Sequence, residues 1–198
     1  MKSLNLTKPH LIVMVGIPGA GKSFFAEQFA ETFKAPIINS ENLRRSLFDI
    51  PSHKKDEDVV VEKISDLMLQ QIFQTDRTIV YVGQTSSRNE RAAITKKART
   101  AGYEPLFIWV QTEPITAKKR SLKPTIKSNA ISPELFDEKL RRFSPPHQNE
   151  KVVVISGKHT FATQLKVVLK RLVEPREKIA IRPPQVQRPT RARNILIR

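Results

Sequence analysis

The chain has 198 residues, of which 39% are hydrophobic, and its formal net charge is +16. This length fits one domain with its own core, and the absence of cysteine excludes a disulfide framework or a thiolate metal site. The sequence contains no apolar run of about 18 residues, so we expect no membrane-spanning helix, and we expect a cytoplasmic protein.

The positive charge is distributed unevenly. Residues 175–198 contain seven Lys or Arg and one acidic residue, so this segment carries +6 and the rest of the chain +10. Because the segment is also rich in proline, we expect a flexible tail after a domain that spans residues 1–174. Charge of this sign attracts nucleotides, nucleic acid and anionic membrane surfaces, but it is equally typical of a solvated basic protein.

Short apolar runs alternate with helical patterns along the chain. The runs that predict strands are residues 11–15, 36–39, 78–82, 104–110 and 151–155. The patterns that predict helices between and after them are residues 22–34, 41–48, 56–74, 88–101 and 160–173. Since this alternation favours βαβ units, we expect a three-layer α/β fold with a parallel sheet of about five strands.

The apolar positions also predict which helix faces pack on the sheet. Phe25, Phe29 and Phe33 recur every four residues, which indicates a buried face rather than a platform for stacking bases. Trp109 lies in an apolar strand pattern and is expected in the core. In the helix over 56–74 the expected buried stripe is Val60, Ile64, Leu67, Met68 and Ile72.

Residues 113–148 interrupt the alternation of strands and helices. They contain two helical patterns, 114–121 and 132–142, without a strand pattern between them, and they are basic. We expect residues 113–148 to form a helical insertion in the α/β pattern, which we call the lid.

A phosphate-binding pattern follows the first predicted strand. Gly16-Ile17-Pro18-Gly19-Ala20-Gly21-Lys22-Ser23 matches GxxxxGK[ST] in full, with a strand before it and a helix after it. Such glycines let backbone N–H groups face phosphate oxygens at a helix N-terminus, while Lys22 and Ser23 suit the β- and γ-phosphates and Mg²⁺. We predict ATP and Mg²⁺ as cofactors, with the nucleotide contacted by Gly16, Ile17, Pro18, Gly19, Ala20, Gly21, Lys22, Ser23 and Phe24, and Mg²⁺ held by Ser23.

With this loop, the chain resembles the AAA-type P-loop kinases grouped around polynucleotide 5′-hydroxyl kinase and the zeta-toxin kinases, over residues 11–157. The segment Asn39-Ser40-Glu41-Asn42-Leu43-Arg44-Arg45 is similar to the S-x-D-x-x-R segment of that family. The resemblance implies that Glu41 accepts the proton of the attacking hydroxyl and that Arg44 holds the acceptor. Glutamate in place of aspartate shifts the reach of the base by about an ångström. The alternative is a solvated helix start, capped by Ser40, in which Glu41 stabilises the helix dipole.

The third motif departs from the family pattern. Gly83-Gln84-Thr85-Ser86 stands where the family usually has D-x-T-N, and Arg88 and Arg91 follow at approximate spacing. The family's aspartate helps to hold Mg²⁺, so its replacement by Gly83 favours weak catalysis or nucleotide binding without turnover as an alternative. Gln84 and Thr85 remain as polar groups at the carboxyl edge of the sheet, where ligands of open α/β folds bind.

Two further motifs belong to the expected lid. Lys118-Lys119-Arg120 lies on its first helix, with Lys123 and Lys127 close behind. The resemblance implies that a lid arginine closes over the transferring phosphate, and Arg120 is the candidate, with Lys119 and Lys123 as alternatives to it. A solvated basic helix face is the other interpretation. The segment from Arg141 to Glu150 is similar to the family's F-x-x-P…E linker, and its expected role is structural.

The predicted function is transfer of the γ-phosphate of ATP to a hydroxyl, with Lys22, Glu41, Arg44 and Arg120 as catalytic residues. The acceptor is a nucleic-acid 5′-hydroxyl or a small sugar or nucleotide. The alternatives are an ATP-binding regulatory or RNA-associated module with little turnover, and a simple NTPase. We assign no function to the scattered histidines, which lack metal-ligand spacing: His10, His53, His147 and His159.

Overall fold

The computed structural model describes residues 6, 8–123, 130–147 and 149–173. The predicted tail from residue 175 and Lys127 of the lid lie outside this part of the chain. The elements, in chain order, are β1 (His10–Val15), α1 (Lys22–Phe33), β2 (Ile37–Asn39), α2 (Ser40–Leu47), α3 (Lys55–Phe73), β3 (Ile79–Val82), α4 (Arg88–Thr100), β4 (Glu104–Gln111), α5 (Pro114–Ser121), α6 (Pro133–Arg142), β5 (Val152–Ser156) and α7 (Phe161–Val173).

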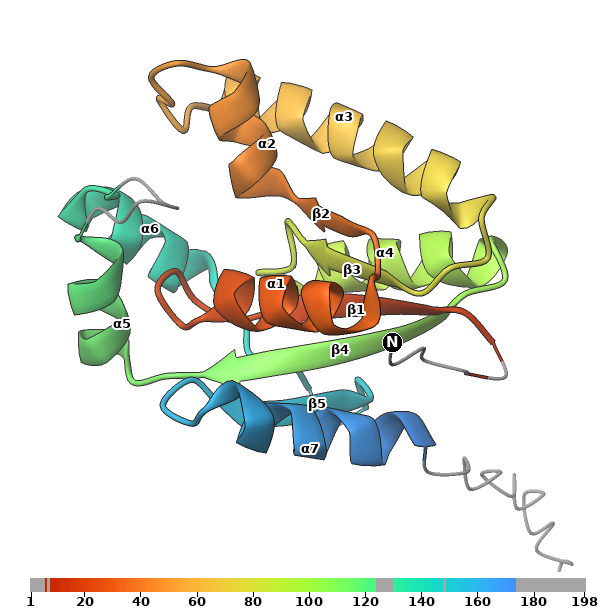
Figure 1. The fold of residues 1–198 in the computed structure, drawn as a ribbon. Coiled ribbons are helices and arrows are strands. Elements are labelled where there is room, and N and C mark those ends of the chain that lie inside the picture. Colours follow the sequence, from red (N-terminus) through yellow and green to blue (C-terminus); the bar gives the residue numbers. More distant parts are fainter. Residues whose placement is uncertain (1–5, 7, 124–129, 148, 174–198) are drawn as a thin grey trace, which may run out of the picture.

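The five strands form one parallel sheet in the order β2-β3-β1-β4-β5 (Figure 1). The central strand β1 pairs with β3 and β4, with Val13 opposite both Tyr81 and Phe107. Because all strands are parallel, their carboxyl ends meet at one edge of the sheet, and the loops that follow them gather there. The predicted three-layer α/β fold with five parallel strands is confirmed.

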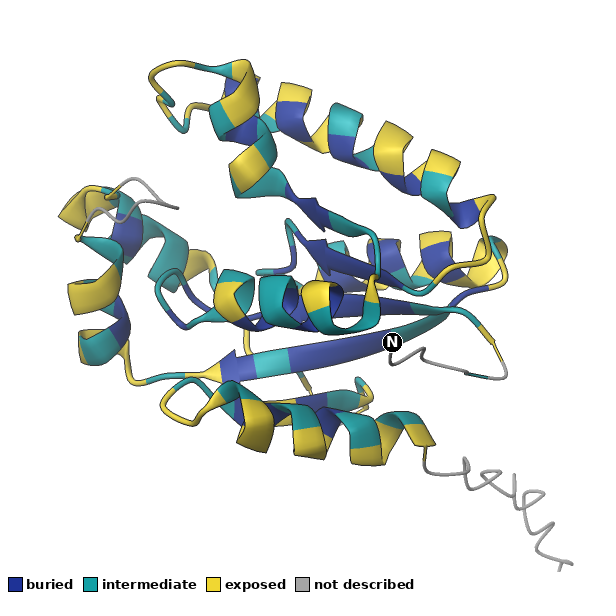
Figure 2. Ribbon diagram, in the orientation of Figure 1, coloured by how far each residue is buried: buried dark blue, intermediate teal, exposed yellow. Residues whose placement is uncertain are grey.

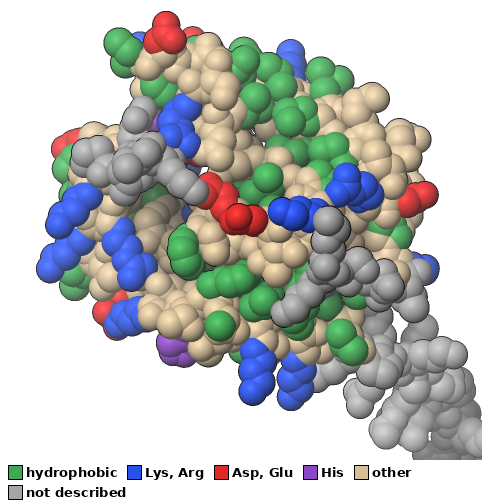
Figure 3. Space-filling model, viewed as in Figure 1, with side chains coloured by type: hydrophobic (Ala, Val, Ile, Leu, Met, Phe, Trp, Pro, Cys, Tyr) green, Lys and Arg blue, Asp and Glu red, His purple; other side chains and the backbone are tan. Residues whose placement is uncertain are grey.

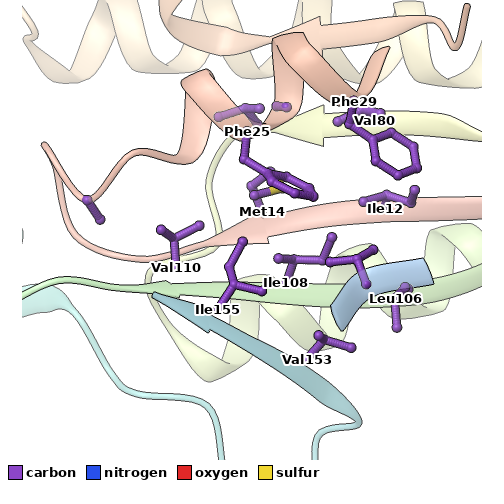
Figure 4. Packing of buried hydrophobic residues seen from close by; sticks show 14 of the residues in the cluster. Ile12, Met14, Phe25, Phe29, Val80, Leu106, Ile108, Val110, Val153 and Ile155 are labelled. Atoms are coloured by element: carbon purple, nitrogen blue, oxygen red, sulfur yellow. The ribbon is translucent and has the colours of Figure 1, made fainter. Parts of the chain in front are cut away.

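Helices cover both faces of this sheet, as Figures 1 and 2 show. On one face α1 and α7 pack against alternate strand residues such as Ile12, Met14 and Ile108 (Figure 4). On the other face α3 and α4 pack against the remaining strand residues, among them Leu11 and Val13. The strands are therefore buried on both sides, which explains why they read as continuous apolar runs.

The aromatic series of α1 confirms one expected face. Phe25 and Phe29 are fully buried and Phe33 packs against them, with ring centroids of Phe29 and Phe33 4.6 Å apart. These rings form part of the core, so they offer no surface for stacking bases.

The expected buried stripe of α3 is wrong. The helix buries Glu57, Val61, Ser65, Leu69 and Phe73, which recur every four residues. Three residues of the expected stripe are exposed: Val60, Leu67 and Met68. The helix carries two apolar stripes of similar period, and the structure buries the one that includes the carboxylate of Glu57, for which α2 supplies a partner.

The start of α2 also differs from expectation. Asn39, not Ser40, caps this helix, because its side-chain Oδ1 accepts hydrogen bonds from the backbone N–H groups of Glu41 and Asn42 at 3.1 and 3.4 Å. The cap thus lies at the last residue of β2, so the strand leads directly into the helix.

Candidate functional site

The phosphate loop is shaped by three glycines. Gly16, Gly19 and Gly21 have φ values of 145°, 72° and 105°, which side chains rarely adopt. A Cβ on Gly19 would also stand 2.1 Å from the carbonyl oxygen of Ala117 in α5. No side chain caps the N-terminus of α1, so its first N–H groups stay available for an anion. The loop therefore has the backbone geometry of a phosphate cradle.

Lys22 lies across this loop. Its Nζ donates hydrogen bonds to the carbonyl oxygens of Gly16 and Ile17, at 2.8 and 2.9 Å. Burial of the ammonium and the nearby charge of Lys139 lower the pKa of Lys22 to about 8. The loop thus holds a cation that lacks an acidic partner among these contacts, and an anion bound in the cradle would stabilise its charged form.

Asn39 connects the phosphate loop to α2. Its Nδ2 donates a hydrogen bond of 3.3 Å to the Ser23 hydroxyl, while its Oδ1 caps α2. The side chain is buried at the carboxyl end of β2. The family-like segment contains Asn39 but implies no role for it. The position of this polar residue, between a buried strand and a helix, is typical of a helix cap.

Glu41 and Arg44 lie together on α2, at the helix start that Asn39 fixes. The Glu41 carboxylate is half-exposed and stands 3.7 Å from Nε of Arg44. Arg44 is only 5% exposed, because its Nη1 donates to Glu57 at 2.9 Å and its Nη2 to Asp58. The structure thus brings the predicted base near the phosphate loop, but the guanidinium of Arg44 already has two carboxylate partners on α3.

Tyr81 fills the space beside Gly83. A Cβ on Gly83 would stand 2.3 Å from both Cζ and the hydroxyl oxygen of Tyr81. An aspartate cannot be accommodated here without moving this ring. Thr85, two residues on, donates its hydroxyl hydrogen bond to the carbonyl oxygen of Met14 at 2.8 Å and is buried. The packing around Gly83 therefore leaves room for a glycine but not for a larger residue.

Arg91 links the third motif to the linker that precedes β5. Its guanidinium donates to both carboxylate oxygens of Glu150, at 2.6 and 3.0 Å, and to the carbonyl oxygens of Thr85 and Ser144. Arg91 is 1% exposed. These contacts hold the loop after β3 against the return from α6 to β5, as the expected structural role of that linker requires.

The lid cations fall into two groups. Arg120 is exposed and donates to the carbonyl oxygen of Gly157, in the loop after β5, at 3.1 Å; Lys119 and Lys123 are exposed too. Lys118 instead binds Asp137 across the two lid helices at 2.7 Å. Lys139 on α6 is the lid cation whose charge acts on Lys22, and no sequence pattern distinguishes it from the other lid cations.

A pocket of about 470 Å³ adjoins the phosphate loop at the carboxyl ends of β4 and β5. Its apolar wall includes Ile17, Leu140 and Phe143, and its polar rim includes Thr112. Trp109, which we expected in the core, lies partly exposed in this wall and packs against Phe143, with ring centroids 6.4 Å apart. A pocket with apolar walls and a polar rim suits a planar base.

Metal ligands are sparse in this site. Within the described ranges, no three His, Asp or Glu side chains converge on a shared metal position. The Ser23 hydroxyl lies at the start of α1 beside the phosphate cradle, and Mg²⁺ in such sites commonly takes its other ligands from phosphates and water. The residues present therefore fit Mg²⁺ bound together with a nucleotide.

The glycine-shaped loop, the lysine across it and the parallel sheet define a P-loop nucleotide-binding protein with a kinase fold. The chain belongs to the AAA_33 family, described as an AAA domain, whose model matches residues 11–146. A comparison with curated protein sequences found no match.

Three solved structures show the same fold. A gluconokinase from Sinorhizobium meliloti 1021 has a TM-score of 0.56 and 21% identity, over 83% of this chain and 91% of that one. A sugar kinase from Janibacter sp. HTCC2649 has a TM-score of 0.59 and 14% identity, over 82% and 93%. Kti12 from Chaetomium thermophilum, solved with ADP-AlF3, has a TM-score of 0.62 and 15% identity, over 81% and 96%.

These matches confirm the P-loop kinase fold. The finer resemblance to polynucleotide 5′-hydroxyl kinase and the zeta-toxin kinases stays a prediction, as do the roles of individual site residues. Among the described residues, no helix is both long and apolar enough to cross a bilayer.

Proposed function

We propose that the chain is an ATP-dependent phosphotransferase that moves the γ-phosphate to a hydroxyl acceptor. The observation that carries this proposal is the chain of contacts from Ser23 through Asn39 to the start of α2. It sets the carboxylate of Glu41 two residues beyond a side chain that touches the phosphate loop. A carboxylate at that place could accept the proton of a hydroxyl that attacks the γ-phosphate.

ATP would enter with its phosphates in the cradle between Gly16 and Ser23. The phosphates replace the carbonyl partners of Lys22, and the N–H groups at the start of α1 bind their oxygens. Phe24 is exposed on the first turn of α1, so its contact with the nucleotide comes through its backbone. The pocket beside Ile17 is the place for the base. Bound Mg²⁺, held by Ser23 and the phosphates, would neutralise charge that develops on the phosphate oxygens.

Transfer then needs one proton acceptor. The acceptor oxygen attacks the γ-phosphorus, its proton passes to the Glu41 carboxylate, and the bond from phosphorus to the β–γ bridging oxygen breaks to release ADP. Because Arg44 is buried between Glu57 and Asp58, we infer that it fixes α2 and the orientation of Glu41. This role differs from the direct clamp on the acceptor that the family resemblance implies.

A lid cation would stabilise the transferring phosphate. Arg120 binds the loop after β5, whereas Lys139 is close enough to the phosphate loop to lower the pKa of Lys22. We therefore infer that Lys139 stabilises the transferring phosphate in the state described here. Arg120 remains a candidate for a state in which α5 has moved.

The acceptor is a nucleic-acid 5′-hydroxyl or a small polyol. Figure 3 shows Lys and Arg side chains scattered over one face, some of them beside the acidic side chains near its centre. The described residues of that face thus form no continuous basic track of the kind that follows a nucleic-acid backbone. The kinase fold of the two sugar kinases makes a sugar or sugar acid the first small acceptor to test.

The test uses γ-labelled ATP and Mg²⁺ with three acceptors: a 5′-hydroxyl oligonucleotide, gluconate, and water alone. Lys22→Ala is the control, because it removes the charge in the cradle. Label on one acceptor that is lost in the control supports the proposal and identifies the acceptor class. Release of free phosphate alone indicates an NTPase, and ATP that binds without being consumed contradicts the proposal.

A second candidate function has its own observation. Tyr81 occupies the space in which a metal-holding carboxylate at position 83 would lie. This packing favours an ATP-binding module with little turnover. The same assay distinguishes it, since such a module binds ATP tightly without transferring label.

A further inference from the structure

The connection between α2 and α3 carries a histidine in an unusual position. His53 has a φ of 55°, a left-handed backbone conformation that non-glycine residues seldom adopt. Its side chain is nine-tenths buried, and its ring Nδ1 is buried without a hydrogen-bond partner. Its Nε2 stands 3.8 Å from Oε1 of Glu41. A buried imidazole with an unused nitrogen therefore faces the proposed base.

Glu57 holds this conformation in place. One carboxylate oxygen of Glu57 accepts the backbone N–H of Ser52 at 2.7 Å, and the other accepts the backbone N–H of His53 at 2.9 Å. The second oxygen also accepts Nη1 of Arg44 at 2.9 Å. The Glu57 carboxylate on α3 therefore fixes both the backbone of His53 and the arginine beside Glu41. Strained backbone that is fixed by several contacts is characteristic of functional sites.

The charges around His53 favour a neutral ring at neutral pH. Burial lowers the pKa of His53, and the charges of Lys139 on α6 and Arg44 on α2 lower it as well. The carboxylates of Glu41 on α2 and Glu57 on α3 act in the opposite direction, but the net direction is below the usual value of 6.5. A neutral imidazole can accept a proton, so His53 is in the right form to act beside a carboxylate base.

We propose that His53 is the acid–base partner of Glu41: the Nε2 atom of its neutral imidazole receives from Glu41 the proton that leaves the acceptor hydroxyl. This inference rests on the proposed phosphotransfer. The proton moves from the acceptor oxygen to Glu41 and then to Nε2 of His53, which becomes an imidazolium that later loses the proton to water. His53 acts through Glu41, so it is a positioning residue.

The 3.8 Å separation fits this role. It is beyond hydrogen-bond length, but the Glu41 side chain is 39% exposed, and contacts of this kind commonly tighten only in the reacting complex. The charge of Lys139, on the lid helix α6, lowers the pKa of His53. The same lysine acts on Lys22, so it connects the histidine electrostatically to the phosphate loop.

The first test is independent of the acceptor. The ring of His53 is titrated by NMR of histidine-labelled protein in the wild type, in Glu41→Gln and in Lys139→Gln. Because the Glu41 carboxylate raises the pKa of His53 and Lys139 lowers it, Glu41→Gln should move the pKa down and Lys139→Gln should move it up. An unchanged pKa in Glu41→Gln overturns the pairing.

The second test measures the rate. Mg·ATP consumption is followed with water, gluconate and the 5′-hydroxyl oligonucleotide as acceptors, across pH. His53→Asn is the main variant, because asparagine tolerates a positive φ and so protects the fold. We expect a fall in kcat of about tenfold or more, with ATP binding unchanged within twofold; the fall can be smaller than the roughly hundredfold lower end of direct proton-transfer effects, because His53 acts through Glu41. His147→Asn, at an exposed histidine, should retain the wild-type rate.

The pH profile separates this role from a structural one. In the wild type, activity should fall as pH drops through the pKa of His53, since the imidazolium can accept no proton. In His53→Asn this acid limb should move to lower pH, because the imidazole that produces it is absent. A His53→Asn protein with wild-type kcat and an unchanged acid limb overturns the proposal. If the wild type consumes no ATP with any acceptor, the phosphotransfer function fails, and the NMR titration still decides whether Glu41 and His53 are paired.

Discussion

The phenol ring of Tyr81 lies over Gly83, where an added Cβ would stand 2.3 Å from the hydroxyl oxygen of Tyr81. The two residues are two positions apart at the end of β3, so their side chains would share one side of the strand. Burial raises the pKa of Tyr81 to about 12, so the phenol stays neutral and cannot replace the charge of a carboxylate. The ring of Tyr81 can therefore occupy this space because residue 83 is a glycine, and residue 83 lacks a side chain where the ring lies.

The first prediction follows from this pair. Gly83→Asp alone should destabilise the protein by about 1–3 kcal/mol, because the new side chain overpacks against the ring. Gly83→Asp combined with Tyr81→Ala should recover part of that loss and place a carboxylate near Ser23. Urea unfolding measures the first effect, and the Mg²⁺ dependence of ATP consumption measures the second. A fully stable single variant would contradict the packing argument.

The second prediction concerns pH and ATP binding. Since the pKa of free Lys22 is lowered to about 8, and bound phosphates favour its charged form, ATP binding above that pH must take up a proton. Affinity should be greatest below pH 8 and fall as pH rises through it. Calorimetry between pH 7 and pH 9.5 checks this.

Lys22→Arg provides the control for that measurement. Arginine stays charged throughout the range, so its profile should be flat above pH 8, whatever its absolute affinity. Identical profiles in the two proteins would show that another group takes up the proton.

The third prediction tests the contacts that hold the loop after β3. Arg91 is buried and binds both oxygens of Glu150. Arg91→Met leaves that carboxylate without its partner, and we expect a loss of about 3–5 kcal/mol in the free energy of unfolding. Arg88→Met, three residues earlier at an exposed position, should cost no more than about 0.5 kcal/mol. Equal effects of the two variants would contradict a structural role for Arg91.

The fourth prediction compares two leucines on α3. Leu69 is 1% exposed and Leu67 is 59% exposed. Leu69→Ala should destabilise the protein by about 2–5 kcal/mol through the cavity it leaves, whereas Leu67→Ala should change stability by less than about 0.5 kcal/mol. Thermal and urea unfolding of both variants measures this difference. A large loss in Leu67→Ala would mean that another surface covers the exposed stripe.

Much of this site could be predicted from the sequence because its information is local. The phosphate loop is a continuous run between a strand and a helix, so Gly16–Ser23 specifies both its shape and its charge. The carboxyl edge of a parallel sheet follows from the alternation of elements, so the sequence also predicted that Gln84 and Thr85 lie at that edge. The sequence does not predict that Tyr81 fills the space beside Gly83, because this packing depends on the orientation of the ring.

The tertiary structure alone decided which residues meet across the fold. His53 is twelve residues from Glu41 in the chain, and it faces that carboxylate only because Glu57 on α3 fixes a left-handed turn between them. Whether Lys139 or Arg120 is the lid cation near the phosphate loop depends on how α5 and α6 pack, and the spacing of residues in the sequence does not predict that packing. The sequence likewise did not determine which face of α3 is buried, since both of its apolar stripes have helical period. Local sequence determines a loop and its charge, whereas contacts between distant elements depend on the packing of the whole domain.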